Sequence, residues 1–142
     1  ELNAPAERPK GRFLIFDQSP YAEAGNGLSS EAVVYNPAAC TGQNGCRLHI
    51  ALHGCEQSRD QVGMTFTEGS GFARWADTNR LVILFPQVEA SILNPKACWD
   101  WWGYTGKNFL TKDAPQIAAI WRMVERLASG NKIANVSAAF HN

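Results

Sequence analysis

Short runs of β-branched and aromatic residues alternate with turn-rich segments along the chain. Residues 12–17 (RFLIFD) and 31–36 (EAVVYN) are two such runs, separated by a connection that contains Gly, Ser and Pro. This arrangement predicts an antiparallel pair of strands. Residues 47–52 (RLHIAL) and 81–86 (LVILFP) are nearly continuously apolar, which predicts two strands covered on both faces.

A helical pattern lies between these two apolar runs. From about Met64 to Asn79 apolar residues recur at helical spacing, and Ser70 is a candidate N-cap within the segment. The order strand, helix, strand over about 40 residues is what a right-handed parallel crossover requires. The pattern therefore predicts an α/β chain.

A further helix is predicted towards the end of the chain. Asp113 is a candidate cap, Pro115 suits the first turn, and the helix is expected to stop near Gly130. Its apolar face is predicted to consist of Ile117, Ile120, Trp121, Val124 and Leu127. Residues 87–112 before it show no strong period, and connections of this length are usually functional. The tail, residues 131–142, fits either a further strand or an irregular end.

Length and charge narrow the class of protein. The chain has 142 residues, the size of one domain. Thirteen basic and thirteen acidic residues cancel without a run of either sign, so neither nucleic acid nor a membrane surface is expected as a partner. No apolar stretch approaches the roughly 20 residues of a membrane span. A soluble chain is expected, and the polar start lacks the apolar region of a signal peptide.

Four cysteines permit two disulfides in three pairings. Cys40 and Cys46 flank a Gly-containing loop that can bring them together, and this pairing leaves Cys55 for Cys98. A zinc site is the alternative, but the spacings are not the short C-x-x-C pairs of zinc modules. Disulfides favour an oxidising compartment, and no metal or other cofactor is expected.

The turn after the run at 47–52 carries residues suited to chemistry. His53, Gly54 and Cys55 follow the predicted strand, and ligands in open parallel sheets bind beyond the carboxyl ends of the strands. Gly54 permits close approach of the main chain, and the backbone N–H groups suit an oxyanion hole. Two other interpretations are a plain turn with Cys55 in a disulfide, and a nucleophilic Cys55 with His53 as base, which a disulfide would exclude.

Residues 98–104 (CWDWWGY) form a second constellation. Exposed aromatic surface usually marks a binding site, which suits the three indoles of Trp99, Trp101 and Trp102. The alternative is that indoles plug the end of the sheet, and the two roles can be divided among them. Asp100 is expected to cap the turn or to accept an indole N–H rather than to serve as the acid of a triad.

A nucleophile elbow of pattern G-x-S-x-G is absent from the sequence. The nearest imitation, residues 27–31 (GLSSE), lacks the second glycine and precedes a strand instead of following one. Ser70 fits better as a helix cap, and Ser137 lacks both glycines. His49 is expected to be a satisfied core residue and His141 part of a disordered end, so the chain is not expected to hold a complete triad.

The order and spacing of four segments resemble those of the extracellular poly(3-hydroxybutyrate) depolymerases. The segments are LHIALHGCEQ, GFARWADTNRLVILFPQ, NPKACWDWWGY and QIAAIWRMVERL. Wider relatives are the secreted feruloyl and acetylxylan esterases of the α/β-hydrolase fold. The resemblance implies ester hydrolysis by a Ser-His-Asp triad. It implies that the Cys55 N–H completes the oxyanion hole, that His53 and Gly54 shape the turn, and that a Cys55–Cys98 disulfide ties the turn to the next loop. The residues expected to line the polyester cleft are Trp99, Trp101, Trp102 and Tyr104.

The resemblance also implies what is missing. In a circularly permuted branch, the elbow, acid and base precede the elements found here. We therefore expect the carboxyl-terminal half of a permuted three-layer α/β-hydrolase domain. Residues 1–46 would form the antiparallel pair and disulfide loop, 47–130 the oxyanion strand through the last helix, and 131–142 an uncertain tail. The missing half of the catalytic domain is the expected partner.

Three expectations follow for the isolated chain: a free sheet edge, an exposed apolar face, and no esterase activity. A secreted or periplasmic location fits the cysteines and the resemblance. Two alternatives stay open, a feruloyl or acetyl esterase of plant cell-wall polysaccharide and a non-catalytic polymer-binding module that has lost its nucleophile.

Overall fold

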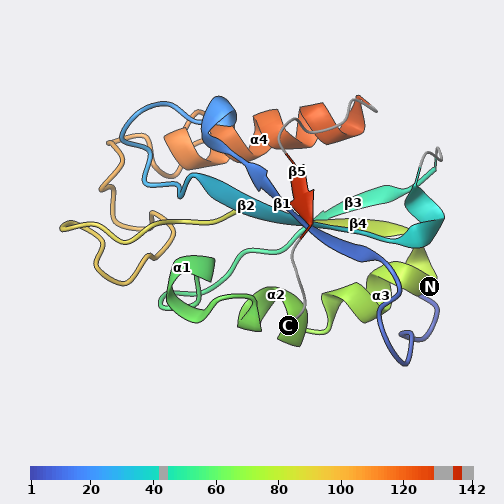
Figure 1. Cartoon of the computed structure of the whole chain (residues 1–142). Coiled ribbons are helices and arrows are strands. Elements are labelled where there is room, and N and C mark those ends of the chain that lie inside the picture. The colour runs from blue at the N-terminus through green and yellow to red at the C-terminus, as the bar shows by residue number, and fades with distance from the viewer. Residues whose placement is uncertain (42–44, 130–135, 139–142) are drawn as a thin grey trace.

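The computed structural model describes residues 1–41, 45–129 and 136–138, the last three by their backbone alone. Within these ranges one mixed sheet forms the centre of the molecule (Figure 1). Its strands are β1 (Arg12–Asp17), β2 (Glu31–Asn36), β3 (Arg47–Ile50), β4 (Leu81–Phe85) and β5 (Val136–Ala138). They lie in the order β3-β4-β2-β1-β5.

The strand pairings predicted from the sequence are confirmed. β1 and β2 pair antiparallel over their whole length, from Arg12 opposite Asn36 to Asp17 opposite Glu31. β3 and β4 pair in parallel, with Arg47 opposite the first residue of β4. The remaining neighbours, β2 with β4 and β1 with β5, are antiparallel.

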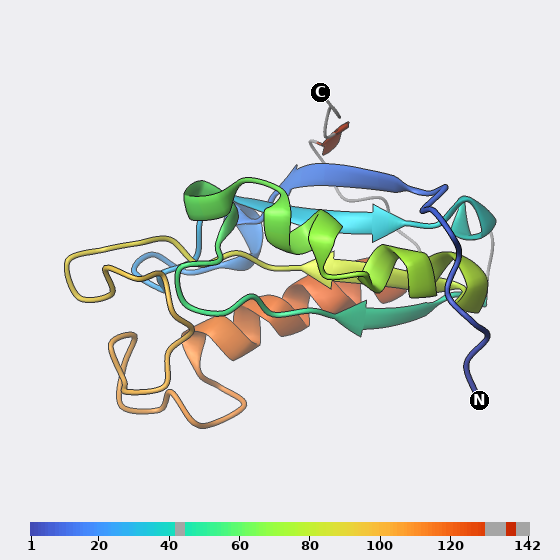
Figure 2. The same ribbon diagram turned by 90° about the horizontal axis from the view of Figure 1, so that it is seen from below.

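Helices cover both faces of this sheet (Figures 1 and 2). On one face lie α1 (Arg59–Val62), α2 (Thr65–Gly69) and α3 (Phe72–Asn79), and on the other lies α4 (Pro115–Ala128). Side chains alternate between the faces along each strand. In β4, Ile83 and Phe85 join the core beneath α2 and α3, whereas Leu84 joins the core beneath α4.

The single helix predicted for residues 64–79 is wrong in detail, because the segment forms two helices. α2 ends at Gly69, and Ser70 follows it as its C-cap instead of opening the next helix. Gly71 is the N-cap of α3, with a φ of 84°. This left-handed conformation interrupts a regular helix and is favourable for glycine, which explains the break.

The strand predicted for residues 47–52 is shorter and less buried than expected. β3 ends at Ile50, and no described strand pairs with its outer side, so it forms an edge of the sheet. His49 is exposed, so its expected core position is wrong. Ile50 is exposed as well, and Leu52 just beyond the strand is 48% exposed. The apolar run is typical of a strand covered on both faces, but part of it is uncovered in this chain. This agrees with the expected free edge.

The last helix begins with Pro115 in its first turn, as predicted, but Ala114 rather than Asp113 is the N-cap. The predicted apolar face is correct only in part. Ile120, Val124 and Leu127 pack against the sheet. Ile117 is exposed, as is Trp121, whose exposed fraction is 61%. The buried line of the helix is instead formed by Gln116, Ala119 and Met123.

The ambiguous tail contains one strand, β5, which pairs with β1. The rest of the tail, including His141, lies outside the described residues. Across the described ranges, no helix has the length and apolar character needed to cross a bilayer.

Candidate active site

Two loops leave the carboxyl ends of the parallel strands and meet at one end of the sheet. The turn at residues 51–58 follows β3, and the long connection at residues 86–114, which holds no helix or strand, follows β4. Both lie at the same end of the molecule in Figures 1 and 2. This is the end of a parallel sheet at which ligands bind.

His53 is buried beneath this turn, with an exposed fraction of 3%. The Val88 backbone N–H donates to Nε2 at 3.2 Å, and Nδ1 lies 2.8 Å from the Gly54 carbonyl oxygen. Burial lowers the pKa of the imidazole, although the contact with Gly54 opposes this. With both nitrogens engaged and Cys55 in a disulfide, the geometry does not match a His-Cys nucleophilic pair.

One backbone N–H group of the turn, that of Cys55, takes no part in the described hydrogen bonds that hold the turn together. The Gly54 N–H donates to Oε1 of Gln57 at 2.9 Å, and the Gln57 N–H donates to the Gly54 carbonyl at 3.2 Å. A Cβ on Gly54 would meet the same Oε1 at 2.9 Å, so a side chain here would displace the end of Gln57. Among the described residues the Cys55 N–H has no acceptor, and Cys55 is exposed.

A set of cross-links clamps the turn to the tryptophan loop. Cys55 and Cys98 form a disulfide, and Cys40 and Cys46 form the second, the pairing expected from the sequence. The Glu56 N–H donates to the Lys96 carbonyl at 2.7 Å, and the two side chains form an ion pair at 3.4 Å. The Trp99 indole N–H donates to the His53 carbonyl at 3.1 Å. The turn is thus fixed by covalent, backbone and side-chain links.

Asp100 organises the loop from within, as the capping interpretation predicted. Its Oδ1 accepts the N–H groups of Trp102, Gly103 and Tyr104, and its Oδ2 accepts both the N–H and the hydroxyl of Thr105. Burial alone would raise the pKa of this carboxyl, but the bonds from Thr105, Gly103 and Tyr104 outweigh it, and the pKa is lowered. The carboxylate therefore stabilises one loop conformation.

The three indoles have different surroundings. Trp99 is partly buried against His53, whereas Trp101 and Trp102 are 71% and 41% exposed. The Trp101 and Trp102 rings meet edge to face at 5.3 Å, and the Trp102 ring lies 4.8 Å from that of Tyr104. The loop therefore presents a small aromatic surface to solvent.

Tyr104 uses its hydroxyl within the fold. It donates to the Cys98 carbonyl at 2.9 Å and accepts from the side chains of Gln116 and Asn94. Gln116 also accepts the Asp100 N–H and donates to the Asn26 carbonyl. Sequence reasoning missed Gln116, because a glutamine in the first turn of a helix carries no signal that it will be buried.

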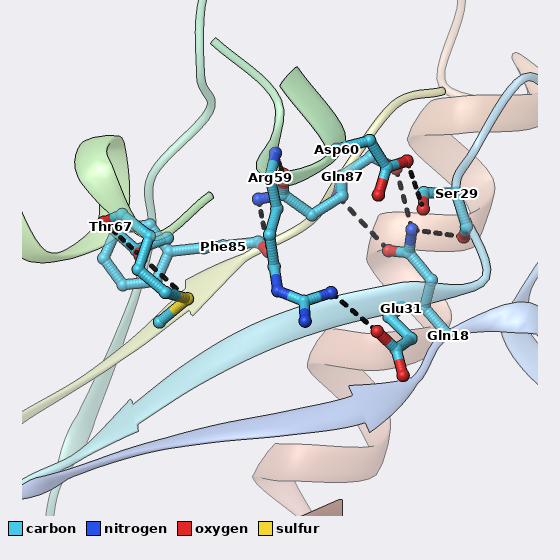
Figure 3. A network of polar contacts seen from close by, with 9 residues as sticks. Gln18, Ser29, Glu31, Arg59, Asp60, Thr67, Phe85 and Gln87 are labelled. Carbon is cyan, nitrogen blue, oxygen red and sulfur yellow. Dashed lines mark hydrogen bonds and ion pairs between the residues drawn. The ribbon is translucent and has the colours of Figure 1, made fainter. Parts of the chain in front are cut away.

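A polar network ties α1, which follows the turn, to segments at the ends of β1, β2 and β4 (Figure 3). The Gln18 amide donates to the carbonyls of Ser29 and Gln87, and Oε1 of Gln87 accepts the Arg59 N–H at 2.7 Å. Ser29, in the segment that imitates a nucleophile elbow, is buried and donates its hydroxyl to Asp60 at 3.1 Å. Ser29 is therefore held by contacts within the fold, and no described histidine is its partner.

Two curated relatives were found by sequence comparison. The chain is 41% identical over 127 residues to a poly(3-hydroxybutyrate) depolymerase of Delftia acidovorans, covering 88% of this chain and 25% of that protein. It is 39% identical over 132 residues to a polyhydroxybutyrate depolymerase of Talaromyces funiculosus, covering 84% of this chain and 39% of that protein. The chain thus spans well under half the length of these relatives. No family model matches it.

Solved structures give the same result. The fold matches the crystal structure of PHB depolymerase from Penicillium funiculosum with a TM-score of 0.86 and 35% identity, over 93% of this chain and 45% of that one. It also matches a serine-to-alanine variant of a PHB depolymerase complexed with an R3HB trimer, with a TM-score of 0.84 and 34% identity over the same shares. The resemblance noted in the sequence is therefore confirmed over most of the chain.

Proposed function

Because the chain is related over most of its length to part of the poly(3-hydroxybutyrate) depolymerases, we propose that it is part of a carboxylic-ester hydrolase of this kind. In this proposal it supplies an oxyanion-hole turn and an aromatic cleft, and the Ser-His-Asp triad lies outside these 142 residues. The observation that carries the proposal is the fold match to a PHB depolymerase over 93% of the chain.

Cys55 would contribute its main chain, not its sulfur. Its N–H lies at the carboxyl end of β3 without an acceptor among the described residues, and the surrounding turn is held rigid by its cross-links. A donor that is oriented before the reaction stabilises the negative charge that develops on the ester oxygen in acyl transfer. His53 and Gly54 would shape this turn.

The aromatic surface would bind the polyester. Trp101 and Trp102 are exposed and in mutual contact, so they can cover the apolar methylene and methyl groups of a hydroxyalkanoate chain. Trp99 and Tyr104 would form the inner wall, since the Trp99 indole N–H and the Tyr104 hydroxyl are already bound within the protein. Their contacts with substrate would be made by the ring faces.

The remaining part of the domain would join at the free edge of β3. A strand added parallel to β3 would end beside the Cys55 turn, where the serine of a strand-to-helix elbow could reach the same ester. A groove of about 630 Å³ runs beside this edge, with Ile50, Ile117 and Trp121 among its lining residues. Burial of this groove would complete a three-layer α/β-hydrolase domain, of which this chain is the carboxyl-terminal half in a permuted order.

A secreted or periplasmic location fits this function, because both disulfides need an oxidising compartment. A polyhydroxyalkanoate is favoured over cell-wall esters as the substrate, because both curated relatives are depolymerases by name.

The test compares the complete polypeptide that contains this segment with the 142-residue chain alone. We expect the complete protein to clear a suspension of poly(3-hydroxybutyrate) granules, and to do so faster than it cleaves a feruloyl ester or acetylated xylan. The chain alone should be inactive on a short-chain nitrophenyl ester. Release of ferulate without polyester cleavage would refute the substrate assignment, and phosphonate-sensitive turnover by the chain alone would refute the missing triad.

A further inference from the structure

The peptide unit between Gly54 and Cys55 contains the proposed oxyanion donor. In a trans peptide the carbonyl oxygen and the N–H point in opposite directions, and no described peptide bond is cis. Whatever holds the Gly54 oxygen therefore also sets the direction of the Cys55 N–H. Two donors hold it: Nδ1 of His53 at 2.8 Å and the Gln57 N–H at 3.2 Å.

This peptide needs such a restraint because it follows a glycine. Gly54 lacks a Cβ, so rotation of the Gly54–Cys55 peptide meets little steric resistance at its first residue. A Cβ on Gly54 would meet Oε1 of Gln57 at 2.9 Å and displace this flexible side chain, which accepts the Gly54 N–H. A flipped peptide would present the Gly54 carbonyl oxygen to the ester, where it would repel the developing oxyanion instead of stabilising it.

The protonation state of His53 is determined by its two partners. The Gly54 carbonyl can only accept, so Nδ1 must carry a proton, and the Val88 N–H can only donate, so Nε2 must be unprotonated. Both contacts therefore require the neutral Nδ1–H tautomer. The rings of Phe66 and Trp99 pack around the imidazole, and burial lowers its pKa, which favours this neutral form.

We propose that His53 is a positioning residue, which keeps the Cys55 N–H turned outwards by donating its Nδ1 proton to the Gly54 oxygen. The Val88 N–H, just after β4, selects the required tautomer of His53. A backbone group that follows β4 thereby controls the direction of the Cys55 N–H in the turn that follows β3. The inference rests on the proposed function, because it takes the Cys55 N–H as the oxyanion donor. It adds a chain of three hydrogen-bonding groups, the Val88 N–H, the His53 imidazole and the Gly54 carbonyl, which the sequence of the turn does not specify.

Two amide variants of His53 separate the positioning role from simple packing. In His53→Asn the side-chain amide nitrogen lies near the place of Nδ1 and can still donate to Gly54. In His53→Gln the amide oxygen reaches the place of Nε2 and can accept from Val88, but no donor faces Gly54. Loss of one oxyanion donor lowers kcat about 100- to 1,000-fold. Because Gln57 still restrains the peptide, we expect a fall of about 10- to 100-fold for His53→Gln.

The measurement is steady-state hydrolysis of a soluble nitrophenyl ester by the complete enzyme, with folding of each variant checked by circular dichroism. We expect kcat to fall with KM nearly unchanged in His53→Gln, since the interaction is made in the transition state. His53→Asn should retain most of kcat. Equal kcat values for the two variants, or a change confined to KM, would overturn the inference.

A second readout does not need activity. Magic-angle-spinning NMR of the chain with ¹⁵N-labelled histidine reports which imidazole nitrogen carries the proton, whether or not the chain self-associates. We expect His53 to be the Nδ1–H tautomer at neutral pH, with the exposed His49 as an internal reference. An Nε2–H tautomer would refute the positioning role even if the enzyme is active. An inactive wild-type enzyme with the expected tautomer would refute the proposed function instead.

Discussion

Removal of the Cys55–Cys98 disulfide tests how strongly the turn depends on its covalent link to the tryptophan loop. The perturbation is the double variant Cys55→Ala with Cys98→Ala, which leaves no free thiol. The matched control removes the second disulfide, with Cys40→Ala and Cys46→Ala. Both variants keep the charge of the chain, so they differ chiefly in the length of the loop that is opened.

The magnitude follows from the loop lengths. In the chain-entropy model, a cross-link stabilises a protein by restricting the unfolded chain, and more so for longer loops. The sequence separation of 43 for Cys55–Cys98 corresponds to about 4 kcal/mol at 25 °C. The separation of 6 for Cys40–Cys46 corresponds to about 2 kcal/mol. We therefore expect the free energy of unfolding to differ by about 2 kcal/mol between the two variants.

The assay is urea denaturation followed by tryptophan fluorescence, with a separate fluorescence titration of an oligomeric 3-hydroxybutyrate ester. All samples need the same protein concentration, because self-association makes the apparent stability concentration-dependent. Ligand binding should weaken in the Cys55–Cys98 variant only, since that disulfide alone joins the tryptophan loop. An equal or larger loss of stability in the Cys40–Cys46 variant would refute the reasoning.

Three further outcomes are expected. Asp100→Asn should lower the free energy of unfolding by about 1–2 kcal/mol at pH 7, because an amide nitrogen would face a backbone N–H. Since the folded pKa of Asp100 is lowered below 3.8, its stabilising contribution is present above that pH and should be lost as the pH falls further. Gly27→Ala should cost about 2–4 kcal/mol in thermal unfolding, because φ is +76° and the new Cβ would lie 2.9 Å from a tyrosine ring atom. Gly25→Ala shares the positive φ but meets nothing within 4 Å, so about 1–2 kcal/mol is expected. Trp121→Lys should reduce self-association of the isolated chain in sedimentation velocity, whereas Trp75→Lys on the other face should not.

For each group of variants, one result would contradict the prediction. An Asp100→Asn chain as stable as wild type at pH 7 would remove the carboxylate from its role in the loop. Equal losses for Gly27→Ala and Gly25→Ala would show that backbone strain alone, without the close approach, sets the cost. A monodisperse wild-type monomer would argue against an interface at the free edge.

Local patterns were sufficient for much of the fold. β1 and β2 were predictable because β-branched and aromatic residues are bounded by turn residues, and the crossover because an apolar run, a helical segment and another apolar run follow each other. The helix boundaries around Ser70 and Asp113 were not, since the φ of Gly71 and the cap at Ala114 depend on how the segments meet the sheet.

Buried amides were the main omission at the candidate site. Gln18, Gln87 and Gln116 support the loops from buried positions, yet glutamine is usually exposed and its burial leaves no trace in a single sequence. Their partners include backbone groups of the loops, which need hydrogen bonds when they are buried. These groups are identified only when the loops are placed together.

The sequence by itself determined the chemistry that this chain can offer: a His-Gly-Cys turn after an apolar run, a loop of three tryptophans, an even set of cysteines, and no nucleophile elbow. These are properties of neighbouring residues. Only the tertiary structure decided that the expected free edge falls at β3 in the described sheet, that the tautomer of His53 is selected by Val88, and that Trp101 and Trp102 face solvent while Trp99 is partly buried. Those outcomes depend on contacts between residues far apart in the chain, which burial and hydrogen-bond satisfaction settle only when the whole fold is assembled.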